Sequence, residues 1–315
     1  MVKTDKIVIT GAAGLVGQNL LVELRSQGYE NIVALDKNRK NMEILKSLHP
    51  EVTTVTTDLV ERGSWETHFT GARRLFLLQA HITGSNWEEF QKDTLDSTEN
   101  VLSAAKEAKV PFTVFAGSSV VHSVKSDNYS KSKLMQEEMT LSSGLSCCVL
   151  RPTLMFGWFD PKHLGWLARF MRKTPIFPIP GDGKFIRQPL YVLDFCKALI
   201  WCSENCPTGK IYDLTGTEDI TYIDIIRTIK KIKKFKTIIL RLPIPLFRFL
   251  MKCYALIFKK PAFVSDQLDS LIAGDYFSGV SFEENFGVTP TPFYEAMVET
   301  LTHEPYCSVV LHRVD

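Results

Sequence analysis

The sequence predicts an α/β protein built on a doubly wound parallel sheet, followed by a smaller α+β domain. Three observations indicate this class. Short apolar runs alternate with segments of helical periodicity through the first half of the chain, as in parallel sheets with helices on both faces. A glycine-rich turn joins the first strand to the first helix, and the second strand ends on an acid. Together these features are typical of the Rossmann-type arrangement.

The totals describe an ordinary globular chain. Its 315 residues are 45% hydrophobic and 23% charged, enough for one large or two interleaved domains with a substantial core. A formal net charge of +2 gives no reason to expect a nucleic acid partner. No segment near Met1 resembles a signal peptide, because strand and glycine turn begin within the first residues. We therefore expect a cytoplasmic protein.

The cysteines predict neither a disulfide framework nor a metal site. Their number is odd, seven, and Cys147 and Cys148 are adjacent in an apolar run. Cys202 and Cys206 have no second Cys or His pair nearby to complete a zinc site. A reducing compartment fits this pattern best.

The first strand, at Ile7–Ile9, leads into glycines at 11, 14 and 17, which open a helix through Ser26. Gly11 allows a tight turn, Gly14 lets the backbone approach a pyrophosphate, and Gly17 lets the helix lie close to the strand. The helix N-terminus offers unpaired N–H groups and partial positive charge to phosphates. The strand, loop and helix therefore predict dinucleotide binding.

The acid that ends the second strand (31–36) is Asp36. A carboxylate at this place accepts hydrogen bonds from the adenosine ribose hydroxyls and disfavours a 2′-phosphate, which predicts NAD. Lys37 and Arg39 stand beside it and would suit that phosphate, so NADP is the less favoured alternative.

Three more strands are predicted at 52–58, 73–80 and 110–117, with a helix over 88–109. The third strand ends in Asp58 and Leu59, which would reach the adenine; the alternative is that Asp58 caps a helix.

Two motifs follow the fifth strand. Ser118 and Ser119 stand at its end, and Tyr129 and Lys133 begin the next predicted helix on one face. A phenol has a pKa of about 10, and bringing it near 7 needs roughly 4 kcal/mol at about 1.4 kcal/mol per unit. Lys133 and an oxidised nicotinamide ring, both positive, would share that load. Ser118, Tyr129 and Lys133 are thus the candidate catalytic residues, with the Ser118 hydroxyl orienting the substrate oxygen.

These residues resemble the extended short-chain dehydrogenases/reductases, the NAD-dependent epimerase/dehydratase family that acts mainly on nucleotide sugars. The resemblance covers nearly the whole chain and rests on GAAGLVG, Asp36, the Ser-Ser strand end, YSKSK, Leu150–Gly157 and Gly181–Asp194. It implies that Arg187 contacts a substrate diphosphate, as a planar guanidinium can. We place His81 and Ser119 at the substrate too. The remaining cofactor-binding residues that it implies are Leu15, Val16, Ala80 and Pro152.

The chain also departs from this family. The link between Ser118 and Tyr129 is short, so one wall of the usual sugar pocket is cut back. Thr94 replaces the Asn that bulges the fourth helix, and His122 replaces a Tyr; we expect a packing or hydrogen-bonded role for His122. Ser119-Val120 lacks the Asp-Glu pair of the sugar dehydratases, which disfavours dehydration. Reversible oxidation of a secondary alcohol remains, as an epimerase or a dehydrogenase.

The expected cofactor domain spans 1–160, with 187–215 returning to it; 161–186 and 216–315 form the substrate domain. In the latter we expect helices at 161–173 and 221–234, an extended, proline-bounded turn at 176–180 and a strand at 211–214. Asp194 is expected to cap a helix over 195–203. The segment 230–260 combines basic runs with a charged apolar stretch too short to span a membrane. It is predicted to form an amphipathic lid helix or subunit contact, or else to lie on the inner membrane face.

The sequence thus favours an NAD-dependent oxidoreductase or epimerase acting on a secondary alcohol of a nucleotide sugar. One alternative is a dehydrogenase of a sterol or lipid alcohol at a membrane surface. Another is a nucleotide-binding subunit without turnover, against which the intact Ser118, Tyr129 and Lys133 argue. On resemblance alone, we expect a homodimer through helices 88–108 and 129–143.

Overall fold

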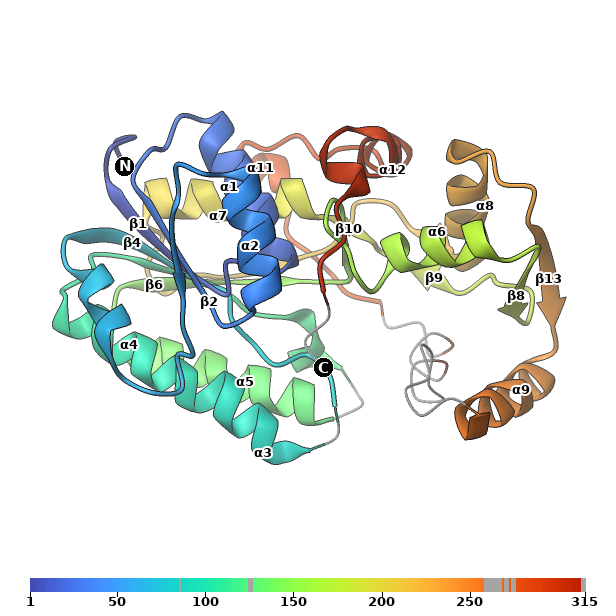
Figure 1. The fold of residues 1–315 in the computed structure, drawn as a ribbon, viewed down its shortest axis with the longest axis horizontal. Coiled ribbons are helices and arrows are strands. Elements are labelled where there is room, and N and C mark those ends of the chain that lie inside the picture. Colours follow the sequence, from blue (N-terminus) through green and yellow to red (C-terminus); the bar gives the residue numbers. More distant parts are fainter. Residues whose placement is uncertain (85, 124–126, 258–267, 269–271, 273–275, 313–315) are drawn as a thin grey trace.

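A seven-stranded parallel sheet forms the centre of the computed structural model, in the order β11-β6-β5-β4-β1-β2-β3 (Figure 1). The structure describes residues 1–84, 86–123, 127–257, 268, 272 and 276–312. The strands are β1 (Lys6–Thr10), β2 (Ile32–Asp36), β3 (Thr53–Thr56), β4 (Ala72–Leu77), β5 (Thr113–Ala116), β6 (Cys147–Pro152) and β11 (Ile211–Leu214). Strand order reverses beside β1, so a ligand crevice is expected where the glycine turn leaves this strand. The predicted doubly wound fold is confirmed.

Helices cover both faces of this sheet (Figure 1). One face carries α1 (Leu15–Ser26), α2 (Arg39–Leu48) and α7 (Val192–Asn205). The other carries α3 (Trp87–Phe90), α4 (Ser97–Glu107) and α5 (Asn128–Ser142). The dimer contact expected through α4 and α5 stays a prediction.

A second lobe packs beside the sheet around its own apolar cluster, which includes Phe177, Ile179 and Ile226. Its short strands pair as β7 with β10, β9 with β12 and β8 with β13. Their bounds are β7 (Met155–Phe156), β8 (Ile176–Pro180), β9 (Ile186–Arg187), β10 (Leu190–Tyr191), β12 (Ile220–Thr221) and β13 (Ile238–Leu242). The helices outside the central layers are α6 (Leu164–Lys173), α8 (Tyr222–Ile232), α9 (Ile244–Ile257), α11 (Phe282–Phe286) and α12 (Phe293–Thr302).

Several local predictions were wrong. Residues 176–180 are extended, as expected, but they form strand β8 rather than a turn, because β13 pairs with them in parallel register. Asp194 lies inside the first turn of α7 and does not cap it; its carboxylate accepts hydrogen bonds from the backbone and hydroxyl of Thr291 instead. Asp58 caps no helix either: its side chain closes a turn by accepting from the amide of Val60 at 3.1 Å.

The predicted helix over 88–109 is interrupted by a π-helical turn, Gln91–Asp96. Thr94 is buried in this turn, and its hydroxyl accepts the amide of His81 at 2.9 Å. The bulge is therefore present although Thr94 stands where the family commonly has Asn. A side chain that takes a backbone hydrogen bond from outside the helix suits such a widened turn.

All seven cysteines are free. The described residues include no cluster of three or more His, Cys, Asp or Glu side chains that could hold a metal ion. Within those same ranges, no helix has the length and apolar character needed to cross a bilayer.

Candidate functional site

The residues predicted from the sequence gather at one edge of the sheet. Every strand of the central sheet is parallel, so the segments that follow β1, β2, β4, β5 and β6 emerge together. Each of these strands ends at a predicted site residue or at most three residues before one. The residues, in strand order, are Gly11, Asp36, Ala80, Ser118 and Pro152. Topology alone thus assembles side chains that are far apart in the sequence.

The glycine turn leaves no room for side chains. A Cβ on Gly11, whose φ is +68°, would lie 2.6 Å from the backbone nitrogen of Gln79, and one on Gly17 would lie 2.4 Å from the carbonyl oxygen of Ala12. Gly14 is the N-cap of α1, and no described side chain caps it. The first-turn amides at Leu15 and Val16 follow directly, a geometry suited to a pyrophosphate. Gln79 Nε2, beside this turn, is buried and lacks a hydrogen-bond partner among the described residues.

Asp36 is fixed against this turn from the end of β2. Its carboxylate accepts the amides of Ala13 at 3.0 Å and of Asn38 at 2.9 Å. Burial raises the pKa of Asp36, and these hydrogen bonds oppose that shift. A carboxylate has about four acceptor positions, so Asp36 keeps acceptor capacity for a ribose hydroxyl. The glycine cradle and this acid fit a dinucleotide.

Lys37, the cation next to Asp36 in the sequence, forms an ion pair. Lys37 Nζ lies 2.6 Å from Asp93 Oδ1, on the π-helical turn. The other oxygen of Asp93 lies 3.3 Å from His81 Nδ1, and Glu89 lies 3.5 Å from the opposite ring nitrogen of His81. His81 therefore lies between two acids and makes an edge-on contact with Phe90, and its Nε2 has no hydrogen-bond partner among the described residues. Near it, Ala80 is half-buried; at the end of β3, Leu59 is buried while Asp58 is exposed.

Ser118 and Tyr129 meet after β5. Ser118 is buried, and its side chain interacts with the Tyr129 phenol. Ser119 is buried next to it. Burial raises the pKa of Tyr129, and the interaction with Ser118 opposes the rise. The protein alone therefore keeps this phenol protonated at neutral pH.

Lys133 lies one helical turn beyond Tyr129 and is only 2% exposed. Its ammonium donates to the carbonyl of Ala116 at 2.8 Å and to Gln136 Oε1 at 2.6 Å. Burial lowers the pKa of Lys133 to about 7. Gln136 in turn donates to the carbonyl of Gln79 at 3.0 Å and to Thr98 at 2.8 Å, which links the lysine to the end of β4. Gln136 was not predicted from the sequence, although its i+3 spacing from Lys133 is a usable signal.

A second network lies beside this one and runs from the buried Glu137 to the exposed His122. Glu137 binds the Arg151 guanidinium through both carboxylate oxygens. Arg151 also contacts His122 at 2.9 Å, and His122 Nε2 lies 3.0 Å from Asp213. The hydrogen-bonded role expected for His122 is thus confirmed. The middle of the short link to Tyr129, residues 124–126, lies outside the described residues.

Pro152 ends β6, and the next residue joins it to the second lobe. Thr153 donates from its hydroxyl to the carbonyl of Gln188 at 2.9 Å. This bond places Arg187, the preceding residue on β9, at the junction of the two lobes. Its positive charge also acts on the buried Tyr222 phenol, whose pKa it lowers against the larger effect of burial.

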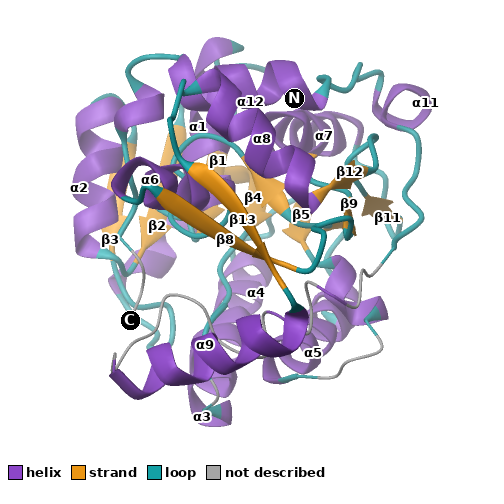
Figure 2. Ribbon diagram, turned by 90° about the vertical axis from the view of Figure 1, so that its right-hand side faces the viewer, coloured by secondary structure: helices purple, strands orange, loops and turns teal. Residues whose placement is uncertain are grey.

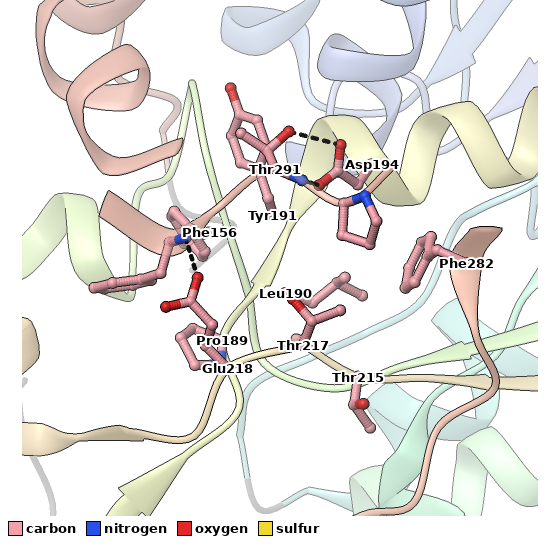
Figure 3. Close-up of a pocket in the computed structure, with 13 residues that line it drawn as sticks. Phe156, Pro189, Leu190, Tyr191, Asp194, Thr215, Thr217, Glu218, Phe282 and Thr291 are labelled. Carbon is pink, nitrogen blue, oxygen red and sulfur yellow. Dashed lines mark hydrogen bonds between the residues drawn. The ribbon is translucent and has the colours of Figure 1, made fainter. Parts of the chain in front are cut away.

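A small cavity of about 20 Å³ lies between these lobes, lined by Tyr191, Asp194 and Thr291 among others (Figure 3). Its lining includes neither Ser118, Tyr129 nor Lys133. At about the volume of one water, it cannot hold a substrate.

Curated relatives of the chain include two reductases. A 4-hydroxy-2-methyl-3-oxo-4-farnesyl-3,4-dihydroquinoline-1-oxide ketoreductase of Stigmatella aurantiaca is 25% identical over 66% of this chain and 67% of its own length. A ceramide reductase of Caulobacter vibrioides is 24% identical over 76% of this chain and 74% of its own length.

A solved structure supports the fold. UDP-glucuronic acid 4-epimerase from Bacillus cereus, in complex with NAD, superposes with a TM-score of 0.71 and 18% identity, covering 94% of this chain and 96% of its own. The model of the NAD dependent epimerase/dehydratase family matches residues 7–214, about two thirds of the chain. The protein therefore belongs to this family of extended short-chain dehydrogenases/reductases, and NAD is its cofactor.

Proposed function

We propose that the protein catalyses reversible oxidation of a secondary alcohol on a nucleotide sugar, with Tyr129 as the proton-exchanging residue. The observation that carries this proposal is the contact of Ser118 with the Tyr129 phenol, one helical turn from the buried ammonium of Lys133. Bound NAD supplies the hydride acceptor. Tyr129 takes the hydroxyl proton of the substrate, Ser118 donates to its oxygen, and Lys133 stabilises the phenolate electrostatically.

The cofactor would run along the strand ends. Gly11, Gly14 and the amides of Leu15 and Val16 would hold its pyrophosphate, with Asp36 at the adenosine ribose. Asp58, Leu59 and Ala80 would line the adenosine side, and Pro152 the nicotinamide side. Gly17 would act indirectly, through the close approach of α1.

Arg187 supports a nucleotide sugar as the substrate. It lies at the junction of the lobes, beside the bond between Thr153 and Gln188, where a guanidinium suits a diphosphate. His81 and Ser119 would complete the substrate side. The Bacillus cereus structure, of a UDP-glucuronic acid 4-epimerase, agrees with this class of substrate.

A lipid alcohol is the second candidate substrate. Two of the reductases among the relatives are named for a farnesyl-bearing substrate and for ceramide. The exposed apolar and basic surface of the second lobe, described below, favours the same candidate. Nucleotide binding without turnover is disfavoured, since Ser118 and Tyr129 remain in contact.

The test uses the full chain with NAD and a panel of UDP-, GDP- and dTDP-sugars, read by thermal stabilisation and turnover. We expect at least one sugar nucleotide to stabilise the NAD-bound protein. Tyr129→Phe should lower turnover by about 10²- to 10⁴-fold and keep NAD affinity. Tyr294→Phe, at an exposed tyrosine of α12, is the matched control and should keep full turnover.

Two results would contradict the proposal in different ways. If no sugar nucleotide stabilises the protein while a ceramide or prenylated ketone turns over, the substrate class is wrong. If turnover is unchanged in Tyr129→Phe, Tyr129 is not the proton-exchanging residue and the proposed mechanism is wrong.

A further inference from the structure

The outer end of the second lobe exposes large apolar side chains on three neighbouring elements. Figure 2 shows β8, β13 and α9 at the front of this end, and α9 contacts β8. We call the exposed apolar side chains of these elements the outer face: Ile176, Ile238, Leu240, Leu246, Phe249 and Leu250.

The strand part of this face has no cover among the described residues. Ile176 and Ile238 are register partners across the two-stranded sheet, and Leu240 follows on the same side. The opposite side of the sheet, with Phe177 and Ile179, packs into the apolar cluster of the lobe. A strand with one solvated face normally alternates apolar with polar residues. Here both faces are apolar, and Ile238 is 63% exposed.

The helix part repeats this arrangement. Leu246, Phe249 and Leu250 have the i, i+3, i+4 spacing that places side chains on one face of α9, and all three are exposed, Phe249 by 61%. Ile244 points the other way, toward Gly181 at the end of β8. Contiguous exposed apolar surface of this kind marks an interaction site.

The charge around the outer face is positive and therefore favours an anionic partner. Residues 225–260 contain eleven Lys and Arg and no Asp or Glu, while the rest of the chain has 26 basic and 35 acidic residues. Three exposed cations lie on or beside these elements. Lys236 stands two residues before β13, Arg241 lies within β13, and Lys252 lies within α9. Along the chain, the acid closest to β8 is Asp182, two residues after this strand ends.

We propose that the outer face docks on an anionic lipid surface, with α9 lying along the interface. A helix of 14 residues is about 21 Å long, too short to span a bilayer. Apolar side chains flanked by cations are the combination that binds anionic membranes in this way. A second copy is a poorer partner, because a two-fold contact would bring the same cations against each other.

The structure also shows which lysines of the basic segment already have contacts within the protein. Lys233 Nζ donates to the carbonyl of Leu301 at 2.9 Å, and Lys231 Nζ lies 4.9 Å from the centre of the Tyr294 ring. These two lysines at the end of α8 support packing against α12. Lys236, Arg241 and Lys252 are therefore the cations to remove in a test.

The experiment measures cosedimentation of the full chain with neutral phosphatidylcholine vesicles and with vesicles containing roughly one third phosphatidylglycerol. The parent should bind only the anionic vesicles. Lys236→Gln/Arg241→Gln/Lys252→Gln should weaken this binding at least tenfold, as should Phe249→Ser/Leu250→Ser. NAD binding, read by thermal shift, should match the parent and so show that the variants fold.

Matched controls remove the same groups elsewhere. Arg39→Gln/Lys40→Gln/Lys46→Gln takes three exposed charges from α2, and Leu134→Ser/Leu141→Ser takes two exposed leucines from α5. Both should bind vesicles like the parent. The proposal is overturned if the parent ignores anionic vesicles or if the charge control loses as much binding as the outer-face variant. It is equally overturned if the parent self-associates without lipid and Phe249→Ser/Leu250→Ser abolishes this.

Discussion

The carboxyl edge of the central sheet and the outer face differ in what surrounds their residues. At the sheet edge, a Cβ added at Gly11 would lie 2.6 Å from the backbone nitrogen of Gln79, and Lys133 is almost completely buried. At the outer face, Ile238 and Phe249 are mostly solvent-exposed. Local geometry dictates the residues of the first region. In the second region, packing does not require apolar residues, so their presence on the surface indicates contact with a partner.

The largest effect is expected at the glycine turn. Gly11→Ala combines a left-handed φ with a backbone clash at 2.6 Å. We expect it to lower the free energy of unfolding by roughly 2–5 kcal/mol and to weaken NAD binding. Denaturant unfolding and cofactor titration measure both.

Gly28→Ala is the control for this prediction. Gly28 has a φ of +84°, yet an added Cβ there meets nothing within 4 Å. Gly28→Ala should lower the free energy of unfolding by only about 1–2 kcal/mol, because it adds the strain of the left-handed φ without a clash. Equal losses in the two variants would mean that packing does not constrain the turn.

A medium effect is expected from the buried lysine. Its folded pKa of about 7 lies below the usual 10.5, so the unfolded chain binds more protons between these values. Stability should therefore rise with pH, by roughly 2 kcal/mol from pH 7 to 9, and stay constant with respect to this group below pH 7.

Lys133→Met should remove this part of the pH dependence, which unfolding titrations at several pH values would detect. The same substitution at Lys131, exposed on the same helix, should keep the parent's pH profile. A Lys133→Met variant with the parent's slope would show that the ammonium is not buried as described.

The smallest effect concerns the choice of cofactor. Asp93 holds Lys37 at 2.6 Å, which keeps this cation from a 2′-phosphate. Asp93→Asn should shift the ratio of NADP to NAD affinity toward NADP by about tenfold, or about 1.4 kcal/mol. Dissociation constants for both cofactors measure the shift, and adding Lys37→Met should abolish it. An unchanged ratio would leave Asp36 alone responsible for the preference.

The sequence predicted most of the central sheet because strands such as β1, β2 and β4 are largely apolar runs, whereas β3 was recognised by alternation. It also brought together Ser118, Tyr129 and Lys133, since their spacing follows from one strand end and one helix. Strand β13 was not predicted: its partner β8 lies some sixty residues earlier, and neither strand has a clear alternation. The contact between Asp194 and Thr291 was missed for the same reason, as pairings this distant leave no local pattern.

The site was predicted less completely on the substrate side. Asp213 joins His122 from a strand 91 residues away, and no spacing rule finds such a partner. Gln136 was within reach of a helical-spacing argument, because it lies one turn from Lys133. Arg187 could be named only by resemblance, and its role stays a prediction.

The uneven charge of the chain has a consequence beyond contact. Eleven cations lie in residues 225–260, whereas the remainder carries a net excess of nine acids. The described part of that segment lies toward one end of the long axis of the molecule (Figure 1). The protein is therefore an electric dipole, and the field of an anionic surface exerts a torque that turns α9 forward before any atoms touch. This steering acts over about 10 Å at 0.1 M salt and only about 3 Å at 1 M, so ionic strength would govern the orientation of encounters.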